Sequence, residues 1–211
     1  MDGSPIETLL AFAATCLVIE LTPGPNMGYL AILSAGEGRR AGFLATLGIA
    51  LGLLIVGVAS ALGLTAIVTA TPWLYEVLRW AGALYLVWLA WEGWRGAHET
   101  SPGTTRDGKD GAQYFVRGLV TNLLNPKAGL FYISVMPAFM IADRPVITQA
   151  ITLTIVYVSI ATLIHTTIVL LADAARPWLE DETRSALVRR TLSALLFVIA
   201  CWLLFATRRV A

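Results

Sequence analysis

The chain has 211 residues, of which 57% are hydrophobic and only 14% are charged. A soluble domain carries about 25% charged residues, so this composition argues against a water-soluble globule. It also excludes a disordered chain, because disorder requires low hydrophobicity and high net charge. Fifteen Lys and Arg against fourteen Asp and Glu give a net charge of +1. No nucleic-acid partner is expected, since so even a balance leaves no basic face, and the composition predicts a protein embedded in the lipid bilayer.

Six segments are predicted to span the membrane, because each offers about 20 largely apolar residues, enough to cross a hydrocarbon core about 30 Å thick. In chain order they are Leu9–Leu33, Phe43–Ala70, Trp73–Trp91, Tyr114–Ala142, Ile147–Ala172 and Thr191–Thr207. Asp2 and Glu7 are unlike the basic start of a signal peptide, so we expect the first segment to be retained. The predicted fold class is an all-α, polytopic membrane protein with six transmembrane helices.

A segment rich in Gly, Ser, Thr and charge, Gly96–Gln113, divides the chain near its middle and is predicted to be a flexible cytoplasmic linker. A nearly constant shift aligns identical residues across it: Phe12 with Phe115, Leu21 with Leu124, Pro23 with Pro126, Tyr29 with Tyr132, and Pro72-Trp73-Leu74 with Pro177-Trp178-Leu179. We therefore predict two three-span repeats, residues 1–95 and 114–211, joined by residues 96–113 within one integrated membrane domain. Three spans per half give a 3+3 inverted-topology repeat, the arrangement of many secondary transporters.

The distribution of Lys and Arg predicts the orientation, because cytoplasmic connections are enriched in these residues. If both termini lie outside the cell, the inside connections hold Arg39, Arg40, Arg95, Arg106, Lys109, Arg117, Arg176, Arg184, Arg189 and Arg190. The outside then holds only Arg79, Arg144, Arg208 and Arg209. This asymmetry predicts that both termini lie outside, although the terminal pair of Arg residues argues mildly the other way.

Two predicted spans are interrupted by helix-breaking residues. The first contains Thr22-Pro23-Gly24-Pro25-Asn26 and the fourth contains Asn125-Pro126. Pro23, Pro25 and Pro126 lack the N–H group that a continuous helix needs. A broken helix at membrane depth is tolerated only inside the protein or beside a water-filled cavity. With Thr22 and Asn125 as predicted N-caps, each break leaves a half-helix N-terminus that favours an anion such as a carboxylate. Alternatively, the prolines only kink the helices and shape their packing.

Two ionisable residues lie beside these breaks. Glu20 shortly precedes the first break, and Lys127 directly follows Pro126. A charge at the bilayer centre costs at least about 2.5–3.5 kcal/mol, so neither side chain is expected to face lipid. One interpretation is a structural ion pair that locks the two halves together. The other is that Lys127 attracts the carboxylate of a substrate, while Glu20 holds its amino group or carries a proton.

Polar residues near the breaks complete the predicted site. Asn26 is either a satisfied cap or a ligand, and Asn122 lies about one turn before Asn125, so that it would face the same cavity. The candidate substrate-binding residues are therefore Glu20, Thr22, Gly24, Asn26, Asn122, Asn125 and Lys127.

Proton coupling has three candidates, Glu20, His165 and Asp173. For His165 the alternative is a hydrogen-bonded packing residue, and for Asp173 it is an interface residue near Arg176. Tyr29 and Tyr132, equivalent in the repeat, either line the cavity or only pack. Small residues predict close helix packing at Gly42, Gly48, Gly52 and Gly57.

Catalytic, metal and cofactor signatures are not found. Cys16 and Cys201 lie in apolar runs and are interpreted as small buried side chains. No His, Cys and carboxylate cluster has metal-ligand spacing, no Gly-rich phosphate loop is followed by Lys-Ser/Thr, and no nucleophile signature is present. We therefore predict no catalytic residue, no metal, no cofactor and no enzymatic activity.

The residues around both breaks resemble the LysE/RhtB family of bacterial amino-acid exporters. The stretch Leu21-Thr22-Pro23-Gly24-Pro25-Asn26, with Gly36 and Arg39-Arg40-Ala41-Gly42 downstream, is similar to the family's N-terminal motif. Its second marker resembles Arg117-Gly118, Asn122, Asn125-Pro126-Lys127-Ala128 and Phe131, and its third span resembles Trp80-Ala81-Gly82-Ala83-Leu84-Tyr85-Leu86. The resemblance covers the whole chain, and Glu20 stands outside the shared motif, so it is a candidate for tuning substrate choice. The resemblance implies export driven by the proton or sodium gradient, and commonly a homodimer.

The resulting prediction is a multi-pass protein of the bacterial inner membrane that exports amino acids or related small metabolites from the cytoplasm. It would work by alternating access, with the proton as the favoured coupling ion and a small-molecule substrate as its partner. Three alternatives stay open at this point: a transporter for another small solute or cation, an intramembrane enzyme, and a non-transporting scaffold.

Overall fold

The structure is a computed structural model that describes residues 5–22, 24–63, 71–96, 111–141, 144–175, 187, 190–191 and 193–201. This part of the chain is helical and contains no strand, which agrees with the predicted all-α class. Its elements are α1 (Pro5–Leu21), α2 (Pro25–Glu37), α3 (Arg39–Ala61), α5 (Pro72–Gly96), α6 (Gly111–Leu123), α7 (Pro126–Leu130), η1 (Phe131–Val135), η2 (Met136–Phe139) and α8 (Val146–Ala174). Residues 193–201 are also helical.

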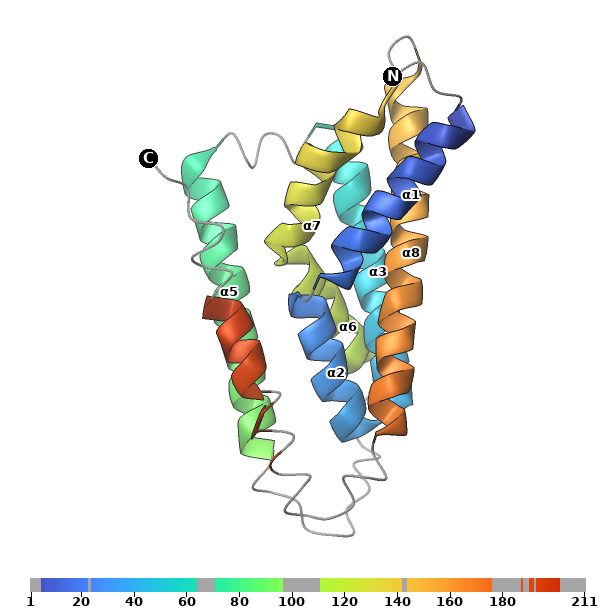
Figure 1. The fold of residues 1–211 in the computed structure, drawn as a ribbon. Helices are drawn as coiled ribbons and strands as arrows, with labels where there is room; N and C mark the ends of the chain where they lie inside the picture. Colours follow the sequence, from blue (N-terminus) through green and yellow to red (C-terminus); the bar gives the residue numbers. More distant parts are fainter. Residues whose placement is uncertain are drawn as a thin grey trace.

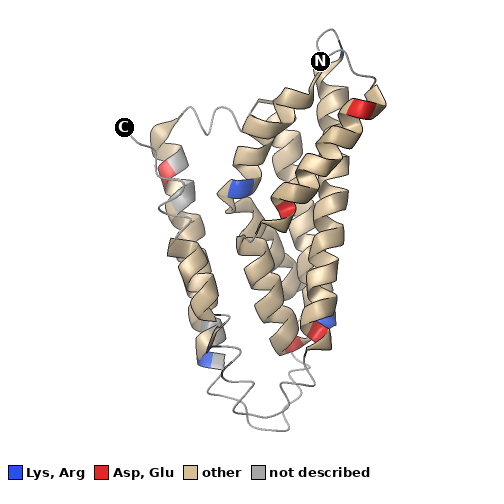
Figure 2. Cartoon of the chain, in the orientation of Figure 1, with Lys and Arg blue, Asp and Glu red and all other residues tan. Residues whose placement is uncertain are grey.

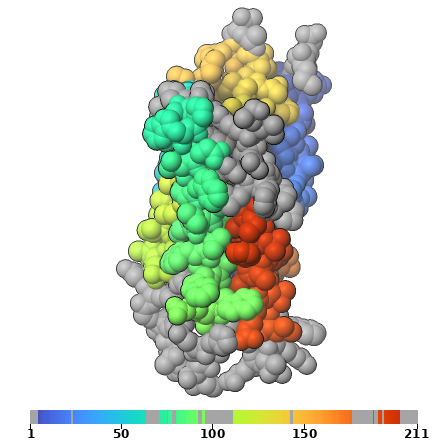
Figure 3. Space-filling model, turned by 90° about the vertical axis from the view of Figure 1, so that its left-hand side faces the viewer, coloured from blue at the N-terminus to red at the C-terminus, as the bar shows by residue number. Residues whose placement is uncertain are grey.

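The long helices α3 and α8 run the height of the bundle, and shorter helices pack on them (Figure 1). In this view α1 and α7 occupy the upper part, and α2 and α6 occupy the lower part. The break between α1 and α2 and the break between α6 and α7 therefore lie at the same level, near the middle of the bundle. On another face, α5 and residues 193–201 lie side by side (Figure 3), and the Arg190 guanidinium lies 5.8 Å from the centroid of the Trp94 ring.

Close approach of α3 and α6 depends on small residues. A Cβ atom at Gly48 would collide with the backbone oxygen of Phe115, and a Cβ atom at Gly118 would collide with the backbone oxygen of Ala45. Gly42, Gly52 and Gly57 likewise face neighbouring side chains at distances too short for a Cβ. The prediction of close helix packing from these glycines is confirmed. Gly38, the single residue between α2 and α3, has φ 91°, a conformation that favours glycine.

The interrupted fourth segment differs from a regular α-helix beyond its predicted break. After α7 the chain continues as the π-helix η1 and the 3₁₀-helix η2. Pro137 lies at the start of η2 and cannot donate the hydrogen bond that an α-helix would require there. The sequence predicted the break at Asn125-Pro126 but not this change of helix type.

Two helices, α3 and α8, are long and apolar enough to cross a membrane on their own within the described residues. Helices α1 and α2 form a third candidate span, with a bend of 59° between them. Large apolar side chains such as Val18, Leu84 and Leu163 are exposed on the outside of the bundle, as expected for a surface in contact with lipid. Six spans and the 3+3 repeat stay predictions. Residues 64–70, 97–110 and 202–207, on which parts of the predicted spans and linker fall, lie outside the described residues, as does Pro177-Trp178-Leu179.

Charged positions in the described part lie mostly toward the ends of the helices (Figure 2). The exceptions in the middle are an acidic position at the end of α1 and a basic position on α7. These are Glu20, near the C-terminal end of α1, and Lys127, the charged residue of α7. The fold thus places the two predicted intramembrane charges at the level of the helix breaks.

Candidate substrate site

The first break ends α1 at Leu21 and begins α2 at Pro25, with Gly24 as the N-cap. The prediction of Thr22 as the N-cap is wrong, because the Thr22 hydroxyl instead donates a hydrogen bond back to the Val18 carbonyl, at 3.3 Å. Pro23 lies outside the described residues. Gly24 supplies no side-chain cap, and Pro25 has no N–H. The backbone N–H groups of the next residues are therefore the donors that the N-terminus of α2 can offer to an anion.

The second break is capped within its own chain segment. Asn125 is the N-cap of α7, and its Oδ1 accepts a hydrogen bond from the Lys127 backbone N–H, at 3.0 Å. Pro126 occupies the first helical position, so the predicted Asn125-Pro126 cap is confirmed. The Ala128 N–H donates to the Asn125 carbonyl, at 3.2 Å. Because these first donors of α7 already have acceptors, its N-terminus has less to offer an anion than that of α2.

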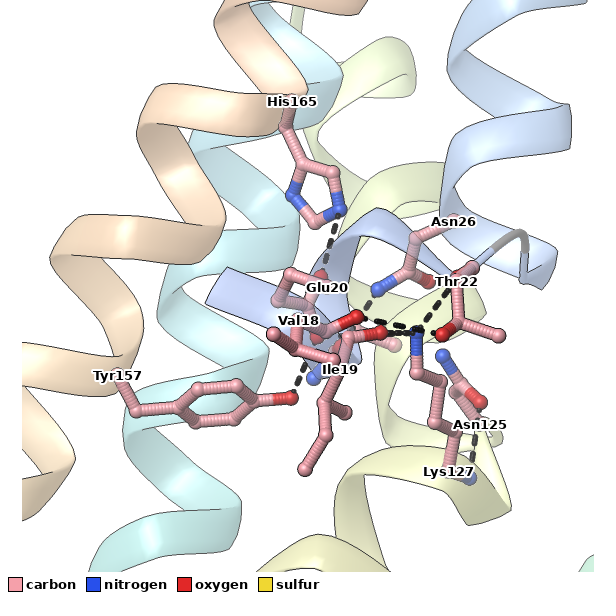
Figure 4. Close-up of polar contacts among 10 residues, drawn as sticks. Val18, Ile19, Glu20, Thr22, Asn26, Asn125, Lys127, Tyr157 and His165 are labelled. Atoms are coloured by element: carbon pink, nitrogen blue, oxygen red, sulfur yellow. Dashed lines mark hydrogen bonds and ion pairs between the residues drawn. The ribbon is translucent and has the colours of Figure 1, made fainter. Parts of the chain in front are cut away.

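The Lys127 side chain joins the two breaks (Figure 4). Its Nζ donates hydrogen bonds to the backbone carbonyls of Ile19 and Thr22, each at 2.9 Å, and lies 4.0 Å from Glu20 Oε1. A cation at the N-terminus of α7 would be disfavoured by the helix dipole. The long side chain resolves this conflict by carrying the ammonium to the C-terminus of α1, where carbonyl groups lack helical partners.

Glu20 is the acidic centre of the site and is only 5% exposed. Its Oε1 accepts a hydrogen bond from the Tyr157 hydroxyl, at 2.7 Å. Its Oε2 lies 3.6 Å from His165 Nε2. Both α8 residues point toward the carboxylate in Figure 4. The geometry thus includes the Glu20–Lys127 ion pair that one interpretation predicted, and it adds two neighbours from α8.

A cavity of about 10 Å³ lies between the breaks, which is about the space that one water molecule needs. Its lining residues come from α1, α2, α3, α7 and α8 and from the N-caps of α2 and α7: Glu20, Gly24, Asn26, Met27, Leu53, Asn125, Lys127, Ala128, Tyr157 and His165. Five of the seven predicted substrate-binding residues are among them. Thr22 and Asn122 are not.

Asn26 and Asn122 instead bind each other. The Asn26 amide Nδ2 donates to Asn122 Oδ1 at 2.9 Å, and both side chains are buried. Asn122 is held against α3, where a Cβ at Gly52 would lie 2.8 Å from its Nδ2. This hydrogen bond connects α2 to α6, so Asn122 contacts the site through Asn26, which lines the cavity.

Asp173 lies at the other end of α8 from the cavity. Its Oδ1 accepts a hydrogen bond from the Arg39 backbone N–H at 3.0 Å, which caps the N-terminus of α3. Eight residues separate it from His165, or about 12 Å along a helix. Among the described residues, Asp173 does not line the cavity, so no contact there supports its predicted role in proton coupling. Glu20 and His165, by contrast, face each other at the cavity.

Tyr157 is the functional candidate that sequence reasoning missed. A usable signal was present, because Thr154, Tyr157 and His165 recur at spacings that place them on one face of a helix. Tyr132, by contrast, donates its hydroxyl to the Leu53 carbonyl at 3.0 Å and does not line the cavity. Within the part of the chain that the structure describes, no group of three or more His, Cys, Asp or Glu residues could hold a metal ion.

A match between the chain and the sequence model of a protein family shows the family to which the chain belongs. The model described as LysE type translocator matches residues 17–207. The chain belongs to the LysE family. Both helix breaks, Glu20 and Lys127 fall inside the matched residues, so the site lies within the LysE region of the chain. No solved structure matches this LysE family member.

Curated relatives include named bacterial efflux proteins. The homoserine/homoserine lactone efflux protein of Salmonella typhimurium is 29% identical over 147 residues, which cover 70% of this chain and 71% of that protein. The threonine efflux protein of Escherichia coli is 29% identical over 135 residues, covering 62% of this chain and 66% of that protein. The uncharacterized membrane protein YahN of Escherichia coli is 32% identical over 150 residues, covering 69% of this chain and 67% of that protein.

Proposed function

We propose that this LysE family member exports amino acids or closely related small metabolites from the bacterial cytoplasm by secondary-active transport. The carrying observation is a buried carboxylate, Glu20, that lines a cavity where two broken helices meet. Binding sites of secondary transporters are built from such interrupted helices near the bilayer midplane. In this proposal the protein is a multi-pass inner-membrane protein built as a 3+3 inverted repeat, with residues 1–95 and 114–211 as its halves and both termini outside. It assembles as a homodimer.

The charges around the cavity suit a zwitterion. The Glu20 carboxylate provides an acceptor for an ammonium group. The first-turn N–H groups of α2, at Asn26 and Met27, provide donors for a carboxylate, and both of these residues line the cavity. The Lys127 ammonium adds a positive charge on the same side, although its Nζ also binds carbonyls of α1. An amino acid would therefore lie between α1 and α2 with its two charges matched to opposite helix ends.

The compounds in the names of the relatives share an amino group, which suggests that this group is the one recognised. Homoserine, homoserine lactone and threonine, which appear in the names of two relatives, all carry a primary amine. A lactone has an internal ester in place of the free carboxylate. We therefore propose that the ammonium is the group that this exporter must recognise, and that the carboxylate strengthens binding when it is present.

The small size of the cavity supports alternating access as part of this proposal. A space of about 10 Å³ cannot hold an amino acid, so the helices around it must separate to admit one. In the proposed cycle the half-helices move relative to α3 and α8, and substrate export is exchanged for proton entry. Glu20 carries the proton, because it is the acidic side chain among the cavity-lining residues.

The test uses inside-out membrane vesicles or proteoliposomes that contain the purified full-length protein. Uptake of radiolabelled amino acids, homoserine lactone and simple amines is measured with and without an imposed pH gradient. We expect saturable uptake of at least one primary amine that is accelerated when the vesicle interior is acidic. Glu20→Gln should abolish this acceleration, whereas Glu7→Gln, an exposed site near the start of the same helix, should not. If no amine is transported, the proposed export is wrong. If the rate of uptake is the same with and without the pH gradient, the proposed proton coupling is wrong.

A further inference from the structure

His165 is a buried polar side chain without a hydrogen bond. It is 1% exposed, and within the described residues neither ring nitrogen has a hydrogen-bond partner. Its ring lines the cavity and points toward Glu20 (Figure 4). Buried polar groups are nearly always paired, because leaving one unpaired destabilises the fold. A packing role is better served by an apolar side chain of similar size, so this imidazole needs a different explanation.

The Glu20 carboxylate is held so that one oxygen faces His165. Oε1 accepts the Tyr157 hydroxyl at 2.7 Å and is the oxygen 4.0 Å from Lys127 Nζ. Oε2 faces His165 Nε2 at 3.6 Å, a separation too long for a direct hydrogen bond. Tyr157 and Lys127 thus occupy one side of the carboxylate and leave Oε2 and the imidazole to face each other beside the cavity.

A group with two or more N–H donors could bridge these two acceptors from the cavity, which both residues line. An ammonium can donate one hydrogen to Glu20 Oε2 and a second to His165 Nε2, provided that the imidazole is neutral with its proton on Nδ1. A hydroxyl has a single hydrogen and cannot donate to both. The cavity volume of about 10 Å³ is also about the size of such a headgroup, although the rest of a substrate requires the site to open.

We propose that His165 is a substrate-binding residue, and that its Nε2 and Glu20 Oε2 together form the subsite for the substrate's ammonium. This proposal rests on the proposed export of amines and names the partner of Glu20 in recognising them. Tyr157 is the positioning residue of this subsite, since its hydroxyl fixes the carboxylate by Oε1. Helix α8 thereby supplies a wall of the binding site that the two helix breaks alone do not provide.

The number of N–H donors on the ligand gives a direct test. Purified full-length protein is titrated calorimetrically with L-threonine, N-methyl-L-threonine and N,N-dimethyl-L-threonine, whose ammonium groups carry three, two and one N–H. The variant His165→Phe keeps a ring of similar size but has no acceptor. We expect it to weaken binding of the first two ligands about tenfold, as the loss of one hydrogen bond predicts, and to leave the affinity for the dimethylated ligand at its wild-type value. His165→Gln, which restores an acceptor, should recover part of the loss.

Two control variants, Thr154→Val for His165→Phe and Tyr132→Phe for Tyr157→Phe, separate an effect on binding from an effect on structure. Thr154→Val removes another buried polar atom from the same face of α8 and should leave all three affinities unchanged. Tyr157→Phe should weaken binding of the ligands with two and three N–H, whereas Tyr132→Phe, which removes a hydroxyl bonded to the Leu53 carbonyl, should not.

Each contrary result has a definite meaning. An equal loss of affinity for all three ligands in His165→Phe, or no loss for any, would overturn the subsite, as would a wild-type protein that binds none of them. Transport is measured separately in proteoliposomes with the same ligands. If binding depends on His165 as expected but no ligand is transported, the proposed export fails while the subsite stands.

Discussion

Lys127 gives the most direct test of how the two helix breaks are held together. Its Nζ donates to the Ile19 and Thr22 carbonyls at 2.9 Å and lies 4.0 Å from Glu20 Oε1. The substitution Lys127→Met keeps the length and apolar stem of the side chain but removes the ammonium. The C-terminal carbonyls of α1 then lose their cap, and the buried Glu20 loses its nearest cation.

The expected loss of stability follows from these contacts. A hydrogen bond that involves a charged group contributes about 1.5–3 kcal/mol, so two of them predict a loss of about 3–6 kcal/mol. The lower end is expected, because 23% of the Lys127 side chain is exposed and water can replace part of what is lost. Two unit charges at 4 Å attract by about 4 kcal/mol at an effective dielectric constant of 20, before desolvation. Desolvation opposes this attraction, so we expect a coupling energy between Lys127 and Glu20 of about 1–3 kcal/mol.

The assay is a double-mutant cycle on the free energy of unfolding. Wild type, Lys127→Met, Glu20→Gln and the double variant are unfolded with denaturing detergent in mixed micelles, and helicity is followed by circular dichroism. The double variant should be more stable than the sum of the single losses predicts. Asp173→Asn combined with Lys127→Met is the control pair, and its effects should add within about 0.5 kcal/mol. A Lys127→Met loss below about 1 kcal/mol, with coupling to Glu20 below about 0.5 kcal/mol, would show that Lys127 does not hold the breaks together.

Three further predictions concern the helices around the site. Gly48→Ala places a Cβ against the backbone of α6, so the yield of folded protein in size-exclusion chromatography should fall. Gly129→Ala, which has open space around its Cβ, should keep the wild-type yield. Equal yields of the two variants would contradict the close approach of α3 and α6. Asn125→Ala removes the cap of α7 and should lower the free energy of unfolding by about 1 kcal/mol, while Asn125→Asp should retain most of the wild-type stability, and an Ala variant as stable as wild type would argue against the cap. Asn26→Leu leaves the buried Asn122 Oδ1 without its donor and should lower the free energy of unfolding by about 1–3 kcal/mol. The Asn26→Leu/Asn122→Leu double variant should lose less than the sum of its single variants, and strict additivity would mean that the two amides do not depend on each other.

The sequence predicted where the helices break, because proline chemistry is local. The sequence predicted Asn125 as the N-cap and Pro126 as the first helical residue, and the structure confirms both positions. At the first break the sequence predicted Thr22 as the cap, but the structure caps α2 with Gly24 before Pro25. Proline marks the position of the break, but it does not determine which neighbouring residue becomes the cap.

The missed features depend on contacts between distant parts of the chain. In the sequence, Lys127 is a cation at the N-terminal end of α7, where the helix dipole disfavours a positive charge. Only the folded structure shows that its ammonium instead binds carbonyl groups at the C-terminal end of α1. Tyr157 lies in an apolar stretch with no nearby charge in the sequence. Its importance arises because α1 places Glu20 within 2.7 Å of its hydroxyl. Thr154, Tyr157 and His165 share one face of α8, which is consistent with a buried polar neighbour but does not identify it.

The charge balance of the site links these contacts to the kind of substrate that it can carry. Glu20 and Lys127 compensate each other, so the empty site is close to neutral and is tolerated at membrane depth. A zwitterionic amino acid adds no net charge, and its two ends meet the C-terminal end of α1 and the N-terminal end of α2, whose partial charges have opposite signs. A lactone carries the ammonium but no free carboxylate, so its binding would add a positive charge that the pair does not balance. The proposed exporter should therefore bind a lactone more weakly than the matching amino acid.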